Sequence, residues 1–378
     1  MDSAKWIQVY ERARVTKKPP NKGRVLVGLS GGVDSAVSAW LLKKEGYDVQ
    51  GVVLRLWEEE EDRTRPWTER TCCHVPMVEY LCERILGIPL EIHESAEEFQ
   101  ERVVVPFRSG YAAGTTPNPC TTCNAEIKIR TLLRIAEKKG IPTIATGHYA
   151  SWAFSEDFRR WGLRMSRDIA KDQSYFLART GGITPENFLL PLGERTKTEV
   201  RTMAEEAGFP VSGMLENQEA CFVSEKRIAD FLRGPERKDE PGEWKALTSE
   251  GESLGSLRTG VGLTRGQRRG HGIAGGERLY VLSVDPLKKE VLMGRREDLL
   301  SGRFAISHPL GIVKDTLPEF PSSFFVRFRS TMPPVPCRPH PEDPLAFQLE
   351  IPHDGIVPGQ VAAFYDRSRI LVGSGLLI

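Results

Sequence analysis

The chain has 378 residues, of which 40% are hydrophobic and 27% charged, and its formal net charge is +1 at pH 7. Because a chain of this length is longer than a single hydrophobic core usually supports, we expect two or three domains. No apolar run approaches the ~20 residues needed to cross a bilayer, which argues against membrane insertion. The near-neutral charge argues against a globally basic protein, so any nucleic acid must be held by a local patch.

Two features bear on the compartment in which the protein works. Residues 1–22 carry six Lys/Arg against two acids and lack the apolar core of a secretory signal, so we interpret them as a basic extension. Seven cysteines, an odd total with one Cys-x-x-Cys pair, are not typical of a disulfide framework. We therefore expect a reducing cytoplasm.

Short apolar runs alternate with segments of helical spacing along the first part of the chain. Strands are expected at 24–29, 49–54, 90–93 and 143–146, and helices at 35–45, 75–86, 97–109 and 124–139. This alternation predicts an α/β domain with a doubly wound parallel sheet and helices on both faces. The charged segment 58–70 is expected to be a mobile connector.

The pattern changes to shorter segments after about Gly208. Strand-like runs at 279–284, 290–293, 324–329, 347–351, 361–365 and 370–372 predict a small antiparallel β-barrel. The Pro-rich stretch 332–344 is expected to be a loop within it. The expected domains are therefore an α/β domain over 23–207, a small central linking domain over 208–278, and a C-terminal barrel over 279–378.

The first chemical motif follows the first expected strand, where a helix is expected to begin. Glycines let the backbone approach phosphate oxygens, and the free N–H groups of a helix start attract anions. Serine hydroxyls add donors, and Asp34 can help to hold Mg²⁺ against a pyrophosphate. An ordinary tight turn is the bland alternative. The predicted phosphate contacts are Gly28, Leu29, Ser30, Gly31, Gly32, Val33, Asp34 and Ser35.

The second motif is Asn118-Pro-Cys-Thr-Thr-Cys123, which precedes the helix expected at 124–139. A helix dipole stabilises a thiolate there, so Cys123 is placed to be nucleophilic or to bind metal. A structural zinc half-site and a redox pair are alternatives, although no second close Cys/His pair completes a zinc site. Cys221, which precedes Phe222, is by itself more typical of a core residue.

These motifs resemble those of the tRNA-specific 2-thiouridylases. The resemblance runs from residues 28–35, called the nucleotide loop below, nearly to the C-terminus. Ser-Gly-Gly-x-Asp-Ser is similar to the loop of the pyrophosphatase-loop ATPases, which cleave ATP between the α- and β-phosphates. Further matching blocks are Ala145-Thr-Gly-His-Tyr-Ala150, Lys171-Asp-Gln-Ser-Tyr-Phe-Leu177, Leu190-Pro-Leu-Gly193, Thr264-Arg-Gly-Gln-Arg-Arg-Gly270 and Val357-Pro-Gly-Gln360. The resemblance implies an adenine nucleotide alpha hydrolase-like fold, with ATP and Mg²⁺ as ligands.

The resemblance also implies the reaction and the partners. A wobble uridine of tRNA would be adenylated at its C2 oxygen, which sulfur then replaces, giving 2-thiouridine, AMP and pyrophosphate. The sulfur donor would be a cysteine desulfurase, a relay protein or free sulfide. A small central domain would link the nucleotide domain to a barrel that helps to grip tRNA. We expect a cytoplasmic monomer or weak dimer.

By position in the matching motifs, the resemblance assigns individual roles. Cys123 would be the nucleophile and Cys221 the carrier of a persulfide, while Leu54 and Gly147 would contact the adenosine. An arginine-rich loop suits contacts with phosphates. The residues expected to face tRNA are Asn118, Pro119, Cys120, His148, Lys171, Asp172, Gln173, Arg265, Gln267, Arg268 and Arg269.

Cys120 departs from the pattern, because many members have Asp at this position. Cys120, Cys123 and Cys221 could ligate a cubane [4Fe–4S] cluster and leave one iron open for sulfide. They could equally be a persulfide pair with an unreactive neighbour.

Three of the motif residues also fit ordinary structural roles. His148 is typical of a satisfied turn histidine, and Lys171-Asp172 of an exposed ion pair.

Two rival functions also fit part of the pattern. One is a different AMP-forming synthetase acting on a small molecule, and the other is a tRNA-binding sulfur carrier without catalysis.

Overall fold

A computed structural model describes residues 23–56, 75–210, 222, 228–233, 244–273, 278–314 and 316–378. The expectations for residues 1–22, for the segment 58–70 and for Cys221 lie outside these ranges. Within them, no helix is long and apolar enough to span a membrane.

A five-stranded parallel sheet, in the order β3-β2-β1-β4-β7, forms the first unit. Its central strand β1 has three fully buried residues in a row, Val25, Leu26 and Val27, as a strand covered on both faces requires. The four predicted strands are confirmed, and the short β7 adds a fifth. The bounds are β1 Arg24–Gly28, β2 Asp48–Arg55, β3 Leu90–Glu94, β4 Thr143–Ala145 and β7 Phe188–Leu189.

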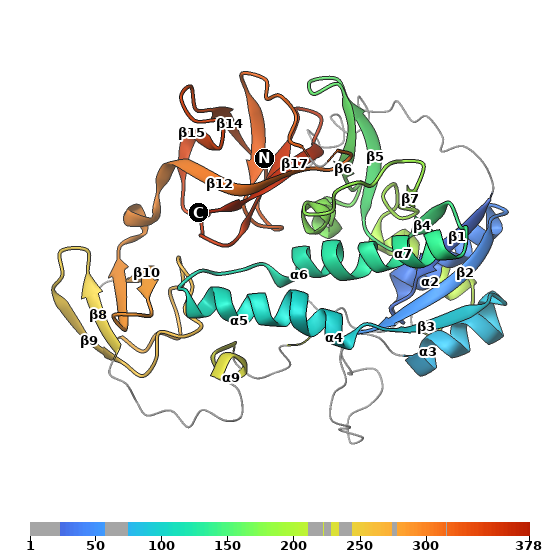
Figure 1. The fold of residues 1–378 in the computed structure, drawn as a ribbon, viewed down its shortest axis with the longest axis horizontal. Coiled ribbons are helices and arrows are strands. Elements are labelled where there is room, and N and C mark those ends of the chain that lie inside the picture. Colours follow the sequence, from blue (N-terminus) through green and yellow to red (C-terminus); the bar gives the residue numbers. More distant parts are fainter. Residues whose placement is uncertain are drawn as a thin grey trace.

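Helices cover both faces of this sheet, which confirms the doubly wound architecture. One face packs against α2 (Val33–Lys44), α3 (Val75–Tyr80) with the π-helical segment η2 (Leu81–Leu86), and α8 (Lys197–Glu206). The other face packs against α4 (Ala96–Phe99), η3 (Gln100–Val104), α5 (Val105–Ala112), α6 (Pro119–Thr122), η4 (Cys123–Ile129) and α7 (Arg130–Lys138). These six join end to end into two helical rods, 96–112 and 119–138, which lie side by side across the middle of the molecule (Figure 1).

The C-terminal barrel is also confirmed. Its strands follow the order β12-β15-β14-β13-β16-β17, and a pairing between β12 and β17 closes the ring. Closure leaves no strand edge within the ring. The interior is aromatic, and the stacked rings of Phe320 and Phe324 have centroids 4.5 Å apart. The bounds are β12 Ser301–Gly311, β13 Phe324–Arg327, β14 Val335–Pro339, β15 Ala346–His353, β16 Val361–Tyr365 and β17 Ile370–Leu377.

Two strands expected in the barrel lie elsewhere. β10 (Tyr280–Asp285) and β11 (Glu290–Gly294) join β8 (Trp244–Thr248) and β9 (Ser253–Leu257) in a four-stranded sheet of order β10-β11-β8-β9. An isolated hairpin buries too little to be stable, and β8 supplies the missing partner. This sheet lies at the end of the molecule opposite the parallel sheet (Figure 1).

The loop expected at 332–344 is partly wrong, because β14 runs through it. Pro336 and Pro339 each lack a backbone donor, but Cys337 is fully buried in the barrel core between them. Burial raises the pKa of the Cys337 thiol, as befits a packing residue.

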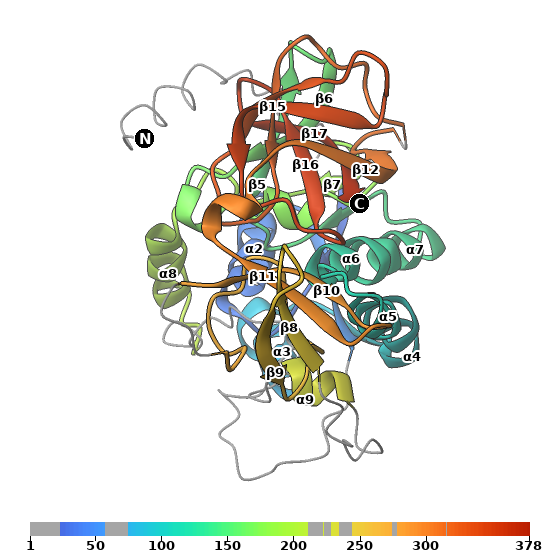
Figure 2. The same ribbon diagram turned by 90° about the vertical axis from the view of Figure 1, so that its left-hand side faces the viewer.

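A hairpin from the nucleotide-binding unit extends the barrel sheet. β5 (Ala150–Ser155) pairs with β6 (Arg160–Met165), and β6 pairs with β17 of the barrel. Figure 2 shows β5 and β6 beside the barrel strands. We keep 23–207, 208–278 and 279–378 as proposed domain limits, with the hairpins β5–β6 and β10–β11 pairing across them.

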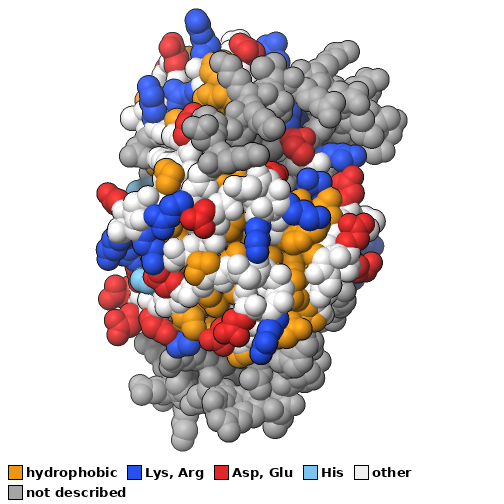
Figure 3. Space-filling view, turned by 90° about the vertical axis from the view of Figure 1, so that its right-hand side faces the viewer, with side chains coloured by type: hydrophobic (Ala, Val, Ile, Leu, Met, Phe, Trp, Pro, Cys, Tyr) orange, Lys and Arg blue, Asp and Glu red, His pale blue; other side chains and the backbone are white. Residues whose placement is uncertain are grey.

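Charge is mixed on the face seen in Figure 3, where Lys/Arg and Asp/Glu side chains are interspersed. This agrees with the formal net charge of +1. On such a surface a polyanion has to be recognised by a local group of basic residues.

Candidate active site

The glycine- and serine-rich loop connects β1 to α2 and is held in shape by its own hydroxyls. Ser35 Oγ accepts from the Ser30 N–H at 3.1 Å and donates to the Gly32 carbonyl at 3.0 Å. Gly31 has a φ of 82°, in the left-handed region that favours glycine. The first N–H groups of α2 have no acceptor within the helix, so they can receive phosphate oxygens. The geometry is thus compatible with the predicted phosphate contacts.

Asp34 lies in the first turn of α2 and has two side-chain partners. Lys197 Nζ donates to both carboxylate oxygens, at 2.7 and 2.8 Å, and the Tyr149 hydroxyl donates to Oδ1 at 2.8 Å. A carboxylate is a suitable ligand for Mg²⁺, so Asp34 fits that role. A metal ion would have to compete with Lys197 for these oxygens.

Gly147 packs directly on the nucleotide loop. A Cβ at this position would lie 2.8 Å from the Asp34 carbonyl carbon and 2.8 Å from the Ser35 nitrogen. Glycine therefore lets the turn after β4 touch the start of α2. Leu54 is buried near the end of β2. Contact of Gly147 and Leu54 with adenosine stays a prediction.

Cys120 and Cys123 lie in the first two turns of the rod 119–138. The helix begins at Pro119, five residues before the predicted start at residue 124, and so includes both cysteines. Asn118 is the N-cap, accepting from the Thr121 N–H at 3.2 Å, and Pro119 occupies the first turn. Cys123 is buried and Cys120 is partly exposed. Both thiols thus lie at the end of the helix whose dipole favours a thiolate.

The barrel clamps the loop before this helix. Gln360 Nε2 donates to the Thr116 carbonyl at 2.7 Å, and Asn118 Nδ2 donates to Gln360 Oε1 at 3.2 Å. The Thr116 N–H donates to the Pro358 carbonyl at 2.9 Å. A Cβ on Gly359 would come within 3.0 Å of the Thr116 backbone. The Asn118 side chain, predicted to face the target base, is therefore used for capping and for the barrel contact.

His148 connects the rod 119–138, which carries Cys120 and Cys123 and is called the cysteine helix below, to the turn after β4. Its Nε2 lies 3.2 Å from Asn124 Oδ1 and its Nδ1 lies 2.7 Å from Thr146 Oγ1. Since Asn124 Nδ2 donates to the Phe176 carbonyl, Asn124 Oδ1 accepts from Nε2–H and Nδ1 accepts from the threonine. Burial, with a smaller effect of Lys128, lowers the pKa of His148 to about 3. Both ring nitrogens are hydrogen-bonded inside the protein, as in a satisfied turn histidine, and contact of His148 with tRNA stays a prediction.

Asp172 lies in the joint with the barrel, which corrects its expected place on the tRNA-facing surface. Its side chain is 1% exposed, and Arg327 of β13, 3% exposed, donates to it at 2.6 Å. The carboxylate also accepts from the Ser174 hydroxyl at 2.9 Å and the Ser166 N–H at 3.0 Å. The Asp172–Arg327 ion pair is therefore buried between the parallel-sheet unit and the barrel.

Gln173 also has an internal role. Its Oε1 accepts from the Tyr149 N–H at 2.9 Å, and its own N–H donates to the Tyr149 carbonyl at 2.8 Å. Gln173 thus fixes the tyrosine that bonds to Asp34. Lys171 is partly exposed, and its contact with tRNA stays a prediction.

The arginine-rich loop contains two kinds of residue. The Arg265 guanidinium donates to backbone carbonyls, including that of Leu282 at 2.6 Å, and its burial lowers its pKa. Gln267 donates to the Arg269 carbonyl at 2.8 Å. These two side chains hold the loop, whereas Arg268 and Arg269 are exposed. The two exposed arginines are thus free of such a role in holding the loop, and contact of the loop residues with tRNA stays a prediction.

The proposed sulfur site is described in part. Among the residues that the structure covers, no three Cys, His, Asp or Glu side chains are grouped as metal ligands. Cys120 and Cys123 supply two of the three thiolates proposed for iron, and Cys221 lies outside the described ranges. Its neighbour Phe222 is buried in the core cluster that includes Cys123, with its ring 5.4 Å from that of Phe107.

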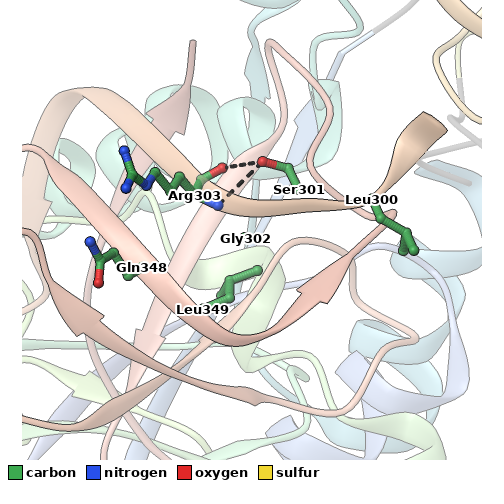
Figure 4. A pocket seen from close by; sticks show the side chains of 6 residues that line it. All are labelled: Leu300, Ser301, Gly302, Arg303, Gln348 and Leu349. Atoms are coloured by element: carbon green, nitrogen blue, oxygen red, sulfur yellow. Dashed lines mark hydrogen bonds between the residues drawn. The ribbon is translucent and has the colours of Figure 1, made fainter. Parts of the chain in front are cut away.

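A pocket on the barrel is lined by residues of β12 and β15 and by Leu300 (Figure 4). It shares no residue with the nucleotide loop or the cysteine helix. Its lining residues are Leu300, Ser301, Gly302, Arg303, Gln348 and Leu349.

The parallel sheet, the loop at its first helix and the attached closed barrel define a nucleotide-binding α/β protein with a β-barrel domain. Residues 23–225 match the family described as "tRNA methyl transferase HUP domain". Residues 306–377 match the "Aminomethyltransferase beta-barrel domain".

Several relatives match over almost the full chain. The "tRNA-specific 2-thiouridylase MnmA 1" of Caldanaerobacter subterraneus subsp. tengcongensis is 36% identical, over 94% of this chain and 97% of its own. The MnmA proteins of Syntrophotalea carbinolica and Chloroflexus aggregans are 36% and 37% identical, over 94% and 92% of this chain and 99% and 97% of their own. The chain therefore belongs to the tRNA-specific 2-thiouridylase family, which confirms the resemblance found in the sequence.

Proposed function

We propose that this protein uses ATP to adenylate the wobble uridine of tRNA at its C2 oxygen, and then replaces that oxygen with sulfur. The observation that carries this proposal is the His148 bridge. It connects Asn124, adjacent to Cys123, with the turn whose Gly147 packs on Asp34 and Ser35. This adjacency supports a single site in which base activation and sulfur chemistry follow each other.

In the first step, the base oxygen bonds to the α-phosphorus of ATP and the uridine N3 proton is lost. The bond from the α-phosphorus to the bridging oxygen breaks, and pyrophosphate leaves with the electron pair. Sulfur then bonds to carbon 2, and AMP leaves with the former base oxygen. The loop serines and the N–H groups of α2 would hold the phosphates, while Asp34 would hold Mg²⁺, which would neutralise phosphate charge.

Two routes could deliver the sulfur. In the persulfide route, the Cys123 thiolate would attack the inner sulfur of a Cys221 persulfide, whose sulfur–sulfur bond breaks as a Cys123–Cys221 disulfide forms. The outer sulfur leaves as sulfide and bonds to carbon 2, and two external thiols then reduce the disulfide. In the cluster route, Cys120, Cys123 and Cys221 would hold a [4Fe–4S] cluster with one iron left open to bind sulfide from the donor. Because Cys120 adds a third soft ligand where relatives often carry a carboxylate, we favour the cluster.

Replacing each of the three cysteines by alanine tests the routes. If a cluster forms, anaerobically purified protein should contain about four irons per chain, and each variant should lose iron and thiolation. The persulfide route instead predicts that Cys120→Ala keeps appreciable activity without iron. Nucleoside mass spectrometry of treated tRNA and an iron assay give the two readouts, with Cys82→Ala in the core as the control. Full thiolation by iron-free wild-type protein would exclude the cluster.

The exposed arginines of the loop 264–270 are the proposed phosphate contacts. The Thr264 side chain lies close enough to the Tyr111 hydroxyl to affect its pKa, so the loop 264–270 adjoins the end of α5, close in sequence to the clamped loop at Thr116. A Cβ on Gly114 would lie 2.4 Å from the Val284 carbonyl oxygen, so the β10–β11 hairpin also touches the loop between α5 and α6. These contacts support tRNA binding beside the cysteine helix.

Reversing the charge of Arg268 and Arg269 together should weaken tRNA binding and flatten its dependence on salt. Each lost phosphate contact should reduce the slope of log K against log salt by roughly 0.7–0.9. Filter binding across a salt series measures this slope. The control reverses the exposed Arg84 and Lys138 of the parallel-sheet unit and should leave the slope unchanged. An unchanged slope in the Arg268/Arg269 variant would show that these arginines are only solvated.

A further inference from the structure

We propose that Lys197 binds the pyrophosphate portion of ATP. Its Nζ holds the Asp34 carboxylate, and it passes to a β- or γ-phosphate oxygen when Mg²⁺ takes that carboxylate. This inference rests on the proposed AMP-forming function and adds a residue that the sequence motifs did not contain.

Burial makes a purely structural role a weak explanation. Lys197 is 7% exposed, and lysine is rarely buried unless it is paired. Its partner Asp34 is more open, with a side chain that is 30% exposed. A buried ion pair contributes little net stability, because the loss of hydration offsets the attraction between the charges. The pair is better explained if one of the two charged side chains binds a ligand.

The backbone of Lys197 is fixed where a cation is electrostatically disfavoured. Lys197 is the first residue of α8, and Thr196 and Glu199 form a reciprocal capping box around it. Its N–H donates to Asp168 Oδ2 at 2.9 Å. The positive end of the α8 dipole opposes a lysine in the first turn. The fold therefore anchors this residue firmly and directs its long side chain to the nucleotide loop.

The charges at the loop call for such a cation. Asp34 lies in the same first turn of α2 whose N–H groups would receive the phosphates, so carboxylate and pyrophosphate would repel each other. Lys197 Nζ already touches both carboxylate oxygens. It also lies 5.8 Å from the centre of the Tyr149 ring, whose face stabilises a cation. A short movement of a flexible side chain would bring the ammonium to a phosphate oxygen.

Binding of two nucleotides to the full chain without tRNA tests this role. Calorimetric titration with Mg²⁺ compares α,β-methylene-ATP, which keeps the pyrophosphate portion and cannot be cleaved there, with AMP, which lacks it. Lys197→Met should weaken binding of α,β-methylene-ATP by about tenfold or more, as expected for one charge-assisted hydrogen bond, and that of AMP by no more than about twofold. Lys43→Met, near the other end of α2, is the matched control and should change neither.

Lys197→Gln keeps a donor for Asp34 and covers the case in which the methionine variant does not fold, as judged by thermal unfolding. It should show the same selective loss, whereas Lys197→Arg should largely retain the preference for the triphosphate analogue. Equal losses for both nucleotides, or no loss for either, would overturn the role of Lys197. Selective loss in a protein that never thiolates tRNA would instead refute only the proposed function.

Discussion

Replacing Asp172 with alanine should lower the free energy of unfolding by about 3–5 kcal/mol. The variant leaves the buried Arg327 guanidinium without its counter-charge. It also removes the acceptor of the Ser166 N–H and one of two partners of the Ser174 hydroxyl. Equilibrium urea unfolding measures the loss.

Asp48→Ala is the control for this stability prediction. The Asp48 carboxylate is 76% exposed and 3.8 Å from Arg24, so its removal should change the free energy of unfolding by less than about 1 kcal/mol. If Asp172→Ala kept the stability of the wild type and only weakened tRNA binding, Asp172 would be a surface contact after all.

Replacing Gly147 with alanine should abolish AMP formation. The added Cβ would lie 2.8 Å from backbone atoms of Asp34 and Ser35, and backbone at the start of a packed helix cannot move aside cheaply. The loop would shift, and with it the donors aimed at the phosphates. Pyrophosphate release with ATP and tRNA measures the effect, and calorimetry should show weaker nucleotide binding.

Gly302→Ala is the matched control for Gly147→Ala. A Cβ at Gly302 would meet its nearest neighbour, Pro352 Cγ, at 3.9 Å, which is ordinary contact. This variant should keep the activity of the wild type. Wild-type turnover by Gly147→Ala would show that the turn and the loop are not packed as described.

The parts of the fold that were predicted correctly have local causes. The run Val25 to Val27 is apolar because helices cover both sides of β1, and such a run is visible without knowing its neighbours. The place of β10 and β11 depended on a partner, β8, whose pairing no local pattern encodes. β14 was missed because its prolines outweighed a single buried cysteine in the pattern.

The site shows the same division. The residues of the nucleotide loop are consecutive in the sequence, so phosphate binding could be predicted from them alone. Lys197, Gln360 and Arg327 were not predicted, because their partners Asp34, Asn118 and Asp172 lie 163, 242 and 155 residues away. The capping box at Thr196 was a visible signal for a helix start, but it did not indicate where the lysine would point.

The internal contacts of two polar motif residues were not predicted for a related reason. His148 and Asp172 stand in motifs that suggest ligand contact, and each bonds to a side chain of another segment. Asn124 bonds to the His148 ring, and Arg327 of the barrel donates to the Asp172 carboxylate. These contacts depend on the whole fold, so the sequence alone did not predict them.

An isotope measurement tests the central claim most directly. A tRNA carrying the heavy oxygen isotope at the C2 position of its wobble uridine is incubated with this protein, ATP, Mg²⁺ and a sulfur source. Because the base oxygen bonds to the α-phosphorus before carbon 2 releases it, the AMP formed should carry the heavy isotope, one atom for each 2-thiouridine. Unlabelled AMP, or AMP and pyrophosphate formed equally well without tRNA, would contradict the account.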